Sequence, residues 1–430
     1  MQSYINPPRE VWAEIQRRPL IQADELRTKV KTILDAIKTE GFTAVQRFAR
    51  QFDGRIPTNI EVSKEEISAA AGKIDEKLKQ ALKTAAQNIS RFHSSQLKDY
   101  PRVTTSEGVV CWQKAVPIEK VGLYIPGGSA PLFSTVLMLG IPAKLAGCRE
   151  IILCTPCNQQ DEVNPAILFA ADLVGITRIF KLGGAQAIGA MAYGAGPVPA
   201  VFKLFGPGNQ YVMAAKQQVS IDQVAIDMPA GPSEVAVMAD ETANPAFIAS
   251  DLLSQAEHGP DSQVILVTTS RELPEKVNQE LALQLNLLPR KEIACQALGN
   301  SKMIIMETSQ DLIDFINQYA PEHLIIAMKD YTEIAEKIHN AGSVFLGNYT
   351  PESAGDYASG TNHTLPTNGW ARSYSGVNMD SFLRKITFQK ITAEGLIHLG
   401  PVIEEMAAAE QLTAHKNAVS LRLKSIQNNQ

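Results

Sequence analysis

The chain has 430 residues, a formal net charge of −5 and an apolar fraction of 45%. This length favours two or three domains over a single small core, and the composition is that of a globular protein rather than a disordered one. The mildly acidic balance gives no electrostatic reason to expect a nucleic acid or an anionic membrane as a partner. No stretch has the roughly 18 to 20 apolar residues that a membrane span requires.

The first hundred or so residues of the chain have the periodicity of helices. Apolar residues recur at helical spacing between charged ones over residues 24–51, and a charged, alanine-rich helical stretch follows over residues 63–97. From about residue 118 short apolar runs alternate with helix-length segments. The strand candidates are residues 121–125, 151–154, 178–182, 201–204, 235–238, 264–267, 303–306, 324–328 and 343–346.

This alternation predicts βαβ units and parallel sheets covered by helices on both faces. The strands are too many for one ordinary sheet, so we expect two α/β globules. The pattern then loosens into a loop rich in Gly, Ser and Asn up to about residue 375. A long helical tail is expected over residues 391–424.

The first residues and the cysteines favour a cytoplasmic enzyme. Residues 1–8 lack both the basic segment and the apolar run of a signal peptide. The five cysteines are an odd and sparse set, as expected in a reducing compartment without a disulfide framework. Cys154 and Cys157 have CxxC spacing, but no second such pair exists, so a structural role is favoured over zinc binding or redox chemistry.

Glycine-rich turns follow three of the strand candidates, at residues 126–129, 183–186 and 206–209. Each would place free backbone N–H groups near the start of a helix, where an anion such as a phosphate binds. Ligands in open α/β sheets sit at the carboxyl ends of strands, which also favours these turns as a binding site. None matches the full dinucleotide-binding fingerprint, so glycine as a simple tight-turn residue is the stronger interpretation of any one turn.

Six of the seven histidines follow residue 250, and several have a ligand-type partner nearby. Asn244 and Pro245 are typical of a helix start, and Gln255 and His258 would then share one face of its last turn. That geometry can offer one oxygen and one nitrogen to a single cation. The alternative is a histidine favoured by the negative end of the helix.

Three further polar segments extend this pattern. Glu322 and His323 precede a strand candidate and are either an acid/base pair or simply a polar beginning to that strand. Asp356 and His363 lie in a long Gly/Ser-rich loop, residues 351–363, of a kind that is usually functional. Glu410 and His415 are expected on the final helix, where they could contact neighbouring groups or be routine surface charges. Together the segments predict a metal-dependent enzyme with an acid/base pair.

As a set, these segments closely resemble the histidinol dehydrogenase family. The resemblance runs from about residue 20 to 424 and is weakest over residues 155–165 and 370–400. The matching stretches are residues 121–131, 183–188, 205–209, 227–234, 254–261, 321–324, 351–363 and 410–416.

The resemblance implies a fold of two incomplete Rossmann-like globules, an N-terminal arm and a helical tail. The expected boundaries are an arm over residues 1–25, a main globule over 26–123 plus 235–377 with most of the metal-binding and catalytic residues, an NAD-binding globule over 124–234, and a tail over 378–430 that crosses to the partner of a homodimer.

The resemblance also implies roles for individual residues. The expected Zn²⁺ ligands, one ion per subunit, are Gln255, His258, Asp356 and His415. The expected acid/base pair is Glu322 and His323, and NAD would contact Tyr124, Gln186 and Asn209. The substrate would contact Ser233, His363 and Glu410 besides His323 and the four metal ligands.

The reaction that the resemblance implies is the NAD-dependent, four-electron oxidation of L-histidinol to L-histidine through L-histidinaldehyde. Three other functions are compatible with the residues. One is a zinc hydrolase with Glu322 as general base, a second is a metal- or amino-acid-binding module without catalysis, and a third is a thiol-dependent aldehyde dehydrogenase.

Overall fold

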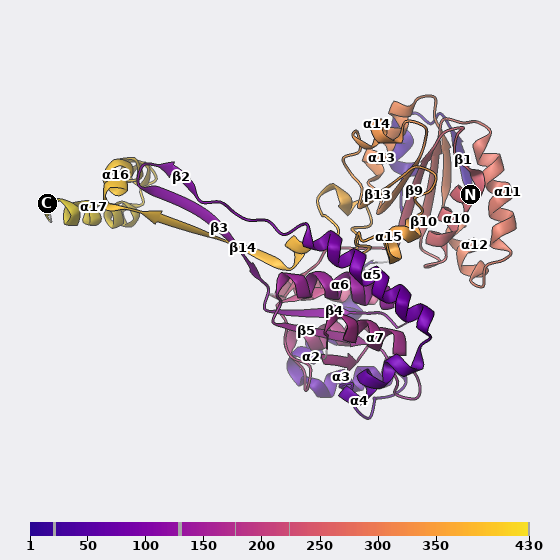
Figure 1. Cartoon of the computed structure of the whole chain (residues 1–430), viewed down its shortest axis with the longest axis horizontal. Coiled ribbons are helices and arrows are strands. Elements are labelled where there is room, and N and C mark those ends of the chain that lie inside the picture. The colour runs from indigo at the N-terminus through magenta and orange to yellow at the C-terminus, as the bar shows by residue number, and fades with distance from the viewer. Residues whose placement is uncertain (20–22, 128–130, 177, 223, 429–430) are drawn as a thin grey trace. The chain divides into compact units, whose positions relative to one another are not determined.

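The computed structural model describes residues 1–19, 23–127, 131–176, 178–222 and 224–428. The chain divides into two compact units, and many of their helices and strands are labelled in Figure 1. The first unit comprises Met1–Gln96 and Ile118–Phe382, and the second comprises Leu97–Pro117 and Leu383–Gln430. Among the described residues, no helix is both long and apolar enough to cross a membrane.

A parallel five-stranded sheet with the order β6-β5-β4-β7-β8 forms one layer of the first unit. Neighbouring residues of a strand point to opposite faces, so Leu123 packs under one group of helices and Tyr124 under another. The strands are β4 (Lys120–Tyr124), β5 (Glu150–Thr155), β6 (Arg178–Lys181), β7 (Lys203–Phe205) and β8 (Ala225–Ile226). One face is covered by α4 (Lys64–Ala70), α5 (Glu76–Ser94), α6 (Phe133–Ala146) and α7 (Pro165–Val174), and the other by α2 (Ala23–Glu40), α3 (Phe42–Asp53), α8 (Gly184–Tyr193) and α9 (Gln210–Val219).

A second parallel sheet, with six strands in the order β1-β11-β10-β9-β12-β13, also belongs to the first unit. Its strands are β1 (Gln2–Ile5), β9 (Glu234–Ala239), β10 (Gln263–Thr268), β11 (Lys302–Ile305), β12 (His323–Ala327) and β13 (Ser343–Leu346). One face packs against α10 (Pro245–Ala256), α11 (Leu273–Leu285) and α12 (Lys291–Gly299), and the other against α1 (Trp12–Ile15), α13 (Ser309–Tyr319) and α14 (Tyr331–Ala335) (Figure 1).

The second unit is a three-stranded antiparallel sheet followed by two helices. The sheet has the order β14-β3-β2 and is formed by β2 (Val103–Ser106), β3 (Val109–Pro117) and β14 (Leu383–Ile391). The helices are α16 (Ala393–Ala409) and α17 (Thr413–Asn428). Gly108 has φ +72°, and a Cβ added there would lie 2.7 Å from the Cα of Gly395, so the turn between β2 and β3 can approach α16 only with glycine.

The predicted α/β class with parallel sheets and helices at the C-terminal end is confirmed, and every strand candidate overlaps an observed strand. Five strands of the described residues were not predicted: β1, β2, β3, β8 and β14. β1, β2 and β8 are short edge strands, β14 is exposed along most of its length, and β3 has a single buried residue, so none has a buried apolar run that would reveal it.

Several predicted boundaries differ from the structure. The helices of residues 26–96 cover the five-stranded sheet, not the six-stranded one as expected, and residues 97–117 belong to the second unit. The expected arm over residues 1–25 contributes β1 and α1 to the second sheet and its core. The tail contains β14, and its long helix is two helices because Gln411 has a left-handed φ of 60°. Residues 128 and 129 of the first glycine-rich turn lie outside the described residues.

A buried ion pair fixes the turn that follows β7. Lys216 Nζ lies 2.5 Å from Asp227 Oδ1, and both side chains are 1% exposed. The ammonium donates to the carbonyl of Gly206 at 2.7 Å, and Asp227 accepts the Gly206 N–H at 2.8 Å. Gly206 has φ +125°, and a Cβ there would lie 2.1 Å from the carbonyl oxygen of Tyr124. The pair thus holds both peptide groups of a glycine that no other residue can replace.

We predict that Lys216→Met lowers the free energy of unfolding by about 3–5 kcal/mol, because it leaves the Asp227 charge buried without its cation. Urea denaturation followed by circular dichroism measures the loss. Lys276→Met is the control, since Lys276 and Glu272 form an exposed pair with side-chain exposures of 57% and 80%. Its effect should stay within about 0.5 kcal/mol. Equal losses in the two variants would contradict the role of the buried pair.

Candidate active site

Glu322 and His323 converge at the amino end of β12, next to β9. His323 is the first residue of β12 and pairs in register with Val235 of β9. Its Nδ1 lies 3.2 Å from the carbonyl oxygen of Glu234 and 3.7 Å from Glu322 Oε2. A proton on Nδ1 can be donated to that carbonyl, and Nε2 is then the nitrogen that can accept a proton as a base. The expected pair is therefore brought together.

The Glu322 carboxylate is buried and held by two donors. Its Oε2 accepts the backbone N–H of Glu234 at 2.8 Å and the side-chain amide of Gln255 at 3.2 Å. Burial raises the pKa of Glu322 to about 8, although the positive charge of His323 opposes the rise. A carboxyl group with its pKa in this range can exchange a proton near neutral pH, as general acid/base chemistry requires.

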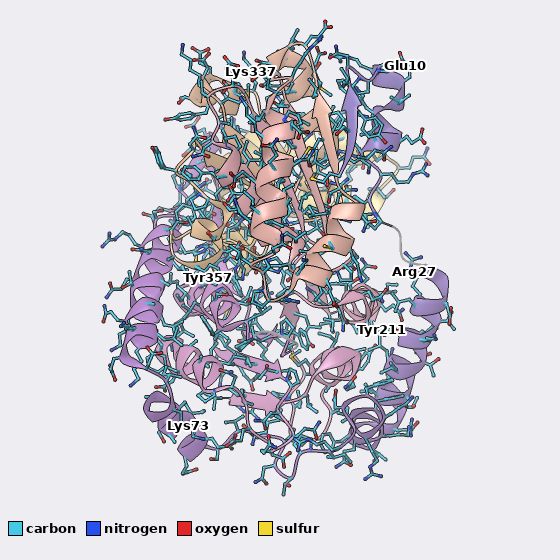
Figure 2. The ribbon with its side chains drawn as sticks, turned by 90° about the vertical axis from the view of Figure 1, so that its right-hand side faces the viewer. Glu10, Arg27, Lys73, Tyr211, Lys337 and Tyr357 are labelled. Carbon is cyan, nitrogen blue, oxygen red and sulfur yellow. The ribbon has the colours of Figure 1, made fainter. Side chains whose placement is uncertain are left out.

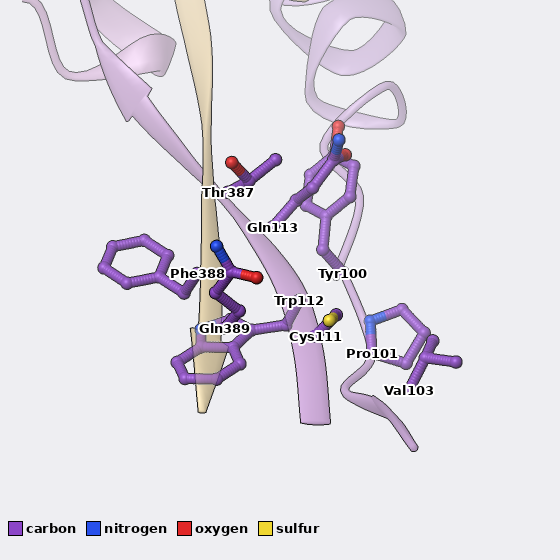
Figure 3. Close-up of a pocket in the computed structure, with 9 residues that line it drawn as sticks. All are labelled: Tyr100, Pro101, Val103, Cys111, Trp112, Gln113, Thr387, Phe388 and Gln389. Atoms are coloured by element: carbon purple, nitrogen blue, oxygen red, sulfur yellow. The ribbon is translucent and has the colours of Figure 1, made fainter. Parts of the chain in front are cut away.

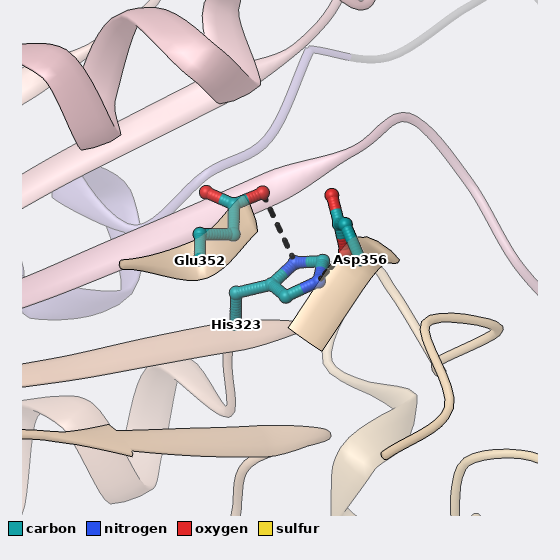
Figure 4. Close-up of side chains that lie close together, drawn as sticks. All are labelled: His323, Glu352 and Asp356. Carbon is teal, nitrogen blue, oxygen red and sulfur yellow. Dashed lines mark ion pairs between the residues drawn. The ribbon is translucent and has the colours of Figure 1, made fainter. Parts of the chain in front are cut away.

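Two carboxylates from α15 (Glu352–Tyr357) close around His323 (Figure 4). Glu352 Oε1 lies 3.8 Å from Nδ1, and Asp356 Oδ1 lies 3.4 Å from Nε2. They are four residues apart and so share one helix face, whereas Tyr357, labelled in Figure 2, is 55% exposed. Ligand atoms of His323, Glu352 and Asp356 lie within 4.8 Å of one another and could together hold a metal ion.

Glu352 is a residue that sequence reasoning missed, and the cause is a wrong secondary structure. Residues 351–363 were expected to be loop, but α15 occupies the first half of the segment. The four-residue spacing of Glu352 and Asp356, which places both side chains on one face of a helix, was the signal that could have revealed Glu352. Glu352 is fully buried, and burial together with the neighbouring carboxylates raises its pKa well above the usual range, against the effect of His323.

Gln255 lies on the last turn of α10, whose predicted cap Asn244 and first-turn Pro245 are confirmed. The side chain is 1% exposed, and its Oε1 atom is buried without a hydrogen-bond partner among the described residues. A buried amide oxygen without a donor is available to a cation. His258 does not share the last turn of the helix as predicted, because α10 ends at Ala256 and His258 follows in an exposed turn.

His258 and His363 nevertheless lie within electrostatic range of Asp356. Burial would raise the pKa of Asp356, but contact with His323 and the fields of His323, His363 and His258 lower it. His363 lies 2.9 Å from the backbone oxygen of Asp356 through Nδ1 and 3.1 Å from Thr135 Oγ1 through Nε2. Six of the residues expected at the site are therefore gathered: Gln255, His258, Glu322, His323, Asp356 and His363. Ser233 directly precedes Glu234.

The residues expected to contact NAD lie at the carboxyl side of the five-stranded sheet. Tyr124 ends β4, and its hydroxyl oxygen accepts the N–H of Gly184 at 3.0 Å. Gln186 donates to Asp53 at 3.1 Å, and exposed Asn209 caps the first turn of α9. Two of the glycine-rich turns, after β6 and β7, therefore lead into α8 and α9. By contrast, the acid/base pair lies at the amino end of β12, although ligands in open α/β sheets generally bind at the carboxyl ends of the strands.

The last two expected residues, Glu410 and His415, lie in the second unit. Glu410 caps the end of α16 and His415 is on α17, so they do not share one helix as predicted. Both are exposed within the single chain. Cys154 and Cys157 are free thiols, and burial raises the pKa of Cys154 well above its usual range, which agrees with a structural role for it.

Comparison with known proteins identifies the family. The family model described as histidinol dehydrogenase matches residues 16–423. A histidinol dehydrogenase of Bacteroides thetaiotaomicron is 59% identical over 420 residues, which cover 98% of each chain. The chain belongs to the histidinol dehydrogenase family.

Other histidinol dehydrogenases support this membership. The protein of Yersinia pestis is 52% identical over 414 residues, which cover 96% of this chain and 93% of its own. The crystal structure of histidinol dehydrogenase from Elizabethkingia anophelis matches with a TM-score of 0.96 and 56% identity over 99% of both chains. The resemblance seen in the sequence motifs is confirmed, and with it the prediction that the chain is an enzyme of this family.

We predict that Glu352→Gln lowers the pKa of His323 in protein freed of metal. Burial alone would lower that pKa, but the negative charges of Glu352, Glu322 and Asp356 outweigh it and hold the pKa above its ordinary value, with Glu352 the largest of them. The variant should therefore lose the imidazolium proton at a lower pH than the parent chain. A pH titration of ¹⁵N-labelled histidine, with His323 assigned by its absence from His323→Asn, measures the change.

Glu333→Gln on α14 is the matched control, because Glu333 is exposed and is not among the groups that raise the pKa of His323. An unchanged titration of His323 in Glu352→Gln would show that the two side chains do not interact as the structure has them.

Proposed function

We propose that this enzyme oxidises L-histidinol to L-histidine in two successive NAD-dependent steps, through L-histidinaldehyde. Its family supports the reaction class, the last step of histidine biosynthesis. The observation that carries the mechanism is the convergence of Glu322 and His323 beside the unpartnered oxygen of Gln255. An acid/base pair next to a cation site suits an alcohol substrate that also carries an imidazole and an amine.

The residues expected to hold Zn²⁺ have suitable donor atoms. Gln255 offers a buried oxygen without a donor, Asp356 a carboxylate whose pKa is lowered by its histidine neighbours, and His258 an imidazole. Oxygen and imidazole ligands are common for this ion. We infer one Zn²⁺ per subunit, held by these residues and His415. When bound, the metal would hold the imidazole and amine of histidinol and so orient its alcohol carbon.

His323 and Glu322 divide the proton transfers. His323 removes the hydroxyl proton through Nε2 as the alcohol carbon loses a hydride, which gives the aldehyde. Glu322 then removes a proton from water as the water adds to the aldehyde, while His323 returns its proton to the aldehyde oxygen, which gives the hydrate and leaves His323 neutral again. His323 then removes a hydroxyl proton of the hydrate as the second hydride leaves, which gives the carboxylic acid. Burial of the pair limits the loss of the reactive aldehyde.

NAD would bind at the carboxyl side of the five-stranded sheet, against Tyr124, Gln186 and Asn209, and accept the hydride in both steps. The turn fixed by Lys216 and Asp227 supports this assignment, because it leads directly into Asn209 and α9. Ser233, His363 and Glu410 are proposed to contact the substrate. A cytoplasmic location belongs to the same proposal and agrees with the free cysteines.

We further propose a homodimer in which the second unit completes the site of the partner. The second unit carries many exposed apolar side chains for its size, which a partner would cover. They include Ile386, Phe388, Val402, Met406, Leu412 and Leu421. A hollow of about 520 Å³ lies beside Trp112 and Phe388 on its sheet (Figure 3). Exposed Glu410 and His415 would then reach the partner's substrate and metal.

We expect two NADH formed for each L-histidinol consumed when NAD is in excess, measured by absorbance with quantified histidine. Removal of metal with a chelator should abolish turnover, and Zn²⁺ should restore it. Gln255→Ala and His258→Asn should retain less zinc after gel filtration, whereas Gln284→Ala on α11 is a control away from the site. Turnover without nicotinamide would favour the hydrolase with Glu322 as base, and binding without turnover would favour the non-catalytic module.

Mixing two inactive variants tests the shared site. His258→Asn and His415→Asn, dissociated and reassembled together, should recover roughly a quarter of the parental activity, because half of the dimers are mixed and one of their two sites is intact. A mixture of His258→Asn with Gln255→Ala is the control and should stay inactive. No recovery in verified mixed dimers would place His415 in the site of its own chain.

A further inference from the structure

Arg18 connects the first residues of the chain to the strand beside the acid/base pair. Its Nε and Nη2 atoms donate to the two carboxylate oxygens of Glu234 at 2.6 and 2.8 Å. The guanidinium also lies over the ring of Tyr319, 4.0 Å from the ring centre. The side chains of Arg18 and Glu234 are 13% and 2% exposed. A two-pronged contact of this kind fixes the orientation of the carboxylate as well as its charge.

Glu234 is the backbone support of the acid/base pair. Its N–H donates to Glu322 Oε2 at 2.8 Å, and its carbonyl oxygen lies 3.2 Å from His323 Nδ1 and 3.1 Å from Gln255 Nε2. One residue therefore orients three expected site residues through its main chain. Its own side chain is held by Arg18 and by the N–H of Asn368 at 2.5 Å.

Arg18 also holds the segment that leads into Glu322. Its Nη2 donates to the carbonyl of Tyr319 at 2.9 Å and lies 3.5 Å from that of Ala320. Ala320 ends α13 in the left-handed conformation, with φ 53°, and Pro321 follows. An alanine in this conformation is strained, and such a residue persists only where its surroundings hold it. The guanidinium thus joins the beginning of β9 to the beginning of β12.

We propose that Arg18 is a positioning residue for Glu322 and His323. Within the described part of the chain, Arg18 hydrogen-bonds to neither of them and acts through Glu234 and the turn at Ala320. The inference rests on the proposed function only in that this pair carries out the chemistry. A lysine cannot replace the contact, because an ammonium lacks the planar fork that meets both carboxylate oxygens.

The test compares Arg18→Met with Arg9→Met in the zinc-loaded enzyme. Arg9 is the matched control, because it also ties the first residues to α13, through Asp311 and Asp314, but does not contact Glu234. Arg18→Met should lower kcat by about tenfold to a hundredfold, as expected for a small misplacement of reacting groups. Its KM for NAD and its zinc content should remain at parental values. Arg9→Met should leave kcat unchanged.

Two further variants separate positioning from stability. Arg18→Met combined with Glu234→Gln removes both buried charges, so its melting temperature should recover relative to Arg18→Met while kcat stays low. Arg18→Lys should keep the charge but restore only part of kcat, and added guanidinium at non-denaturing concentrations should partly rescue Arg18→Met. Recovery of kcat together with melting temperature would overturn the proposal. So would a loss of kcat equal to that of Arg9→Met, or one explained wholly by lost zinc.

A readout without turnover keeps this test separate from the proposed function. The ¹⁵N resonances of the His323 ring should shift in Arg18→Met and not in Arg9→Met, whatever reaction the enzyme catalyses. Absence of histidinol-dependent NADH in the parent chain would defeat the proposed function alone. Unchanged His323 resonances in Arg18→Met would defeat the positioning role alone.

Discussion

The main chain of Glu234 is the constraint on which the site depends. Parallel pairing of β9 with β12 places His323 opposite Val235. Glu234, which precedes Val235, therefore donates its N–H to Glu322 and presents its carbonyl oxygen to His323. A peptide group inside a sheet has little freedom to move, because its neighbours in the ladder are already hydrogen-bonded. Side chains that hydrogen-bond to this peptide group are therefore also held in a fixed position, as preorganised proton transfer requires.

Buried charge has opposite consequences in the two sheets of the first unit. Around His323, burial raises the pKa values of Glu322 and Glu352, and the surrounding carboxylates raise the pKa of the imidazole against the effect of its burial, so these groups can exchange protons. In the five-stranded sheet Lys216 and Asp227 form a closed pair whose further hydrogen bonds go to the backbone of Gly206 and Met228. The first arrangement suits chemistry, and the second suits a fixed turn.

The sequence predicted much of the site because its residue types are unusual in their local context. Glu322, His323, Gln255 and Asp356 stand in short polar segments that a core does not need, and the family resemblance gave them roles. Glu352 was missed because the helix that carries it is short and lies in a segment rich in Gly and Ser. No feature of the sequence indicated a role for Arg18, since a single arginine near the start of a chain is ordinary.

Local patterns by themselves determined the α/β class, the strands with buried apolar runs and the family, because each depends on residues close together along the chain. Only the tertiary structure decided which sheet the helices of residues 26–96 cover, since an apolar helix face does not specify its partner. It also decided that the acid/base pair lies at the amino ends of β9 and β12. Contacts such as that of Arg18 with Glu234, 216 residues apart, exist only once the sheet has formed.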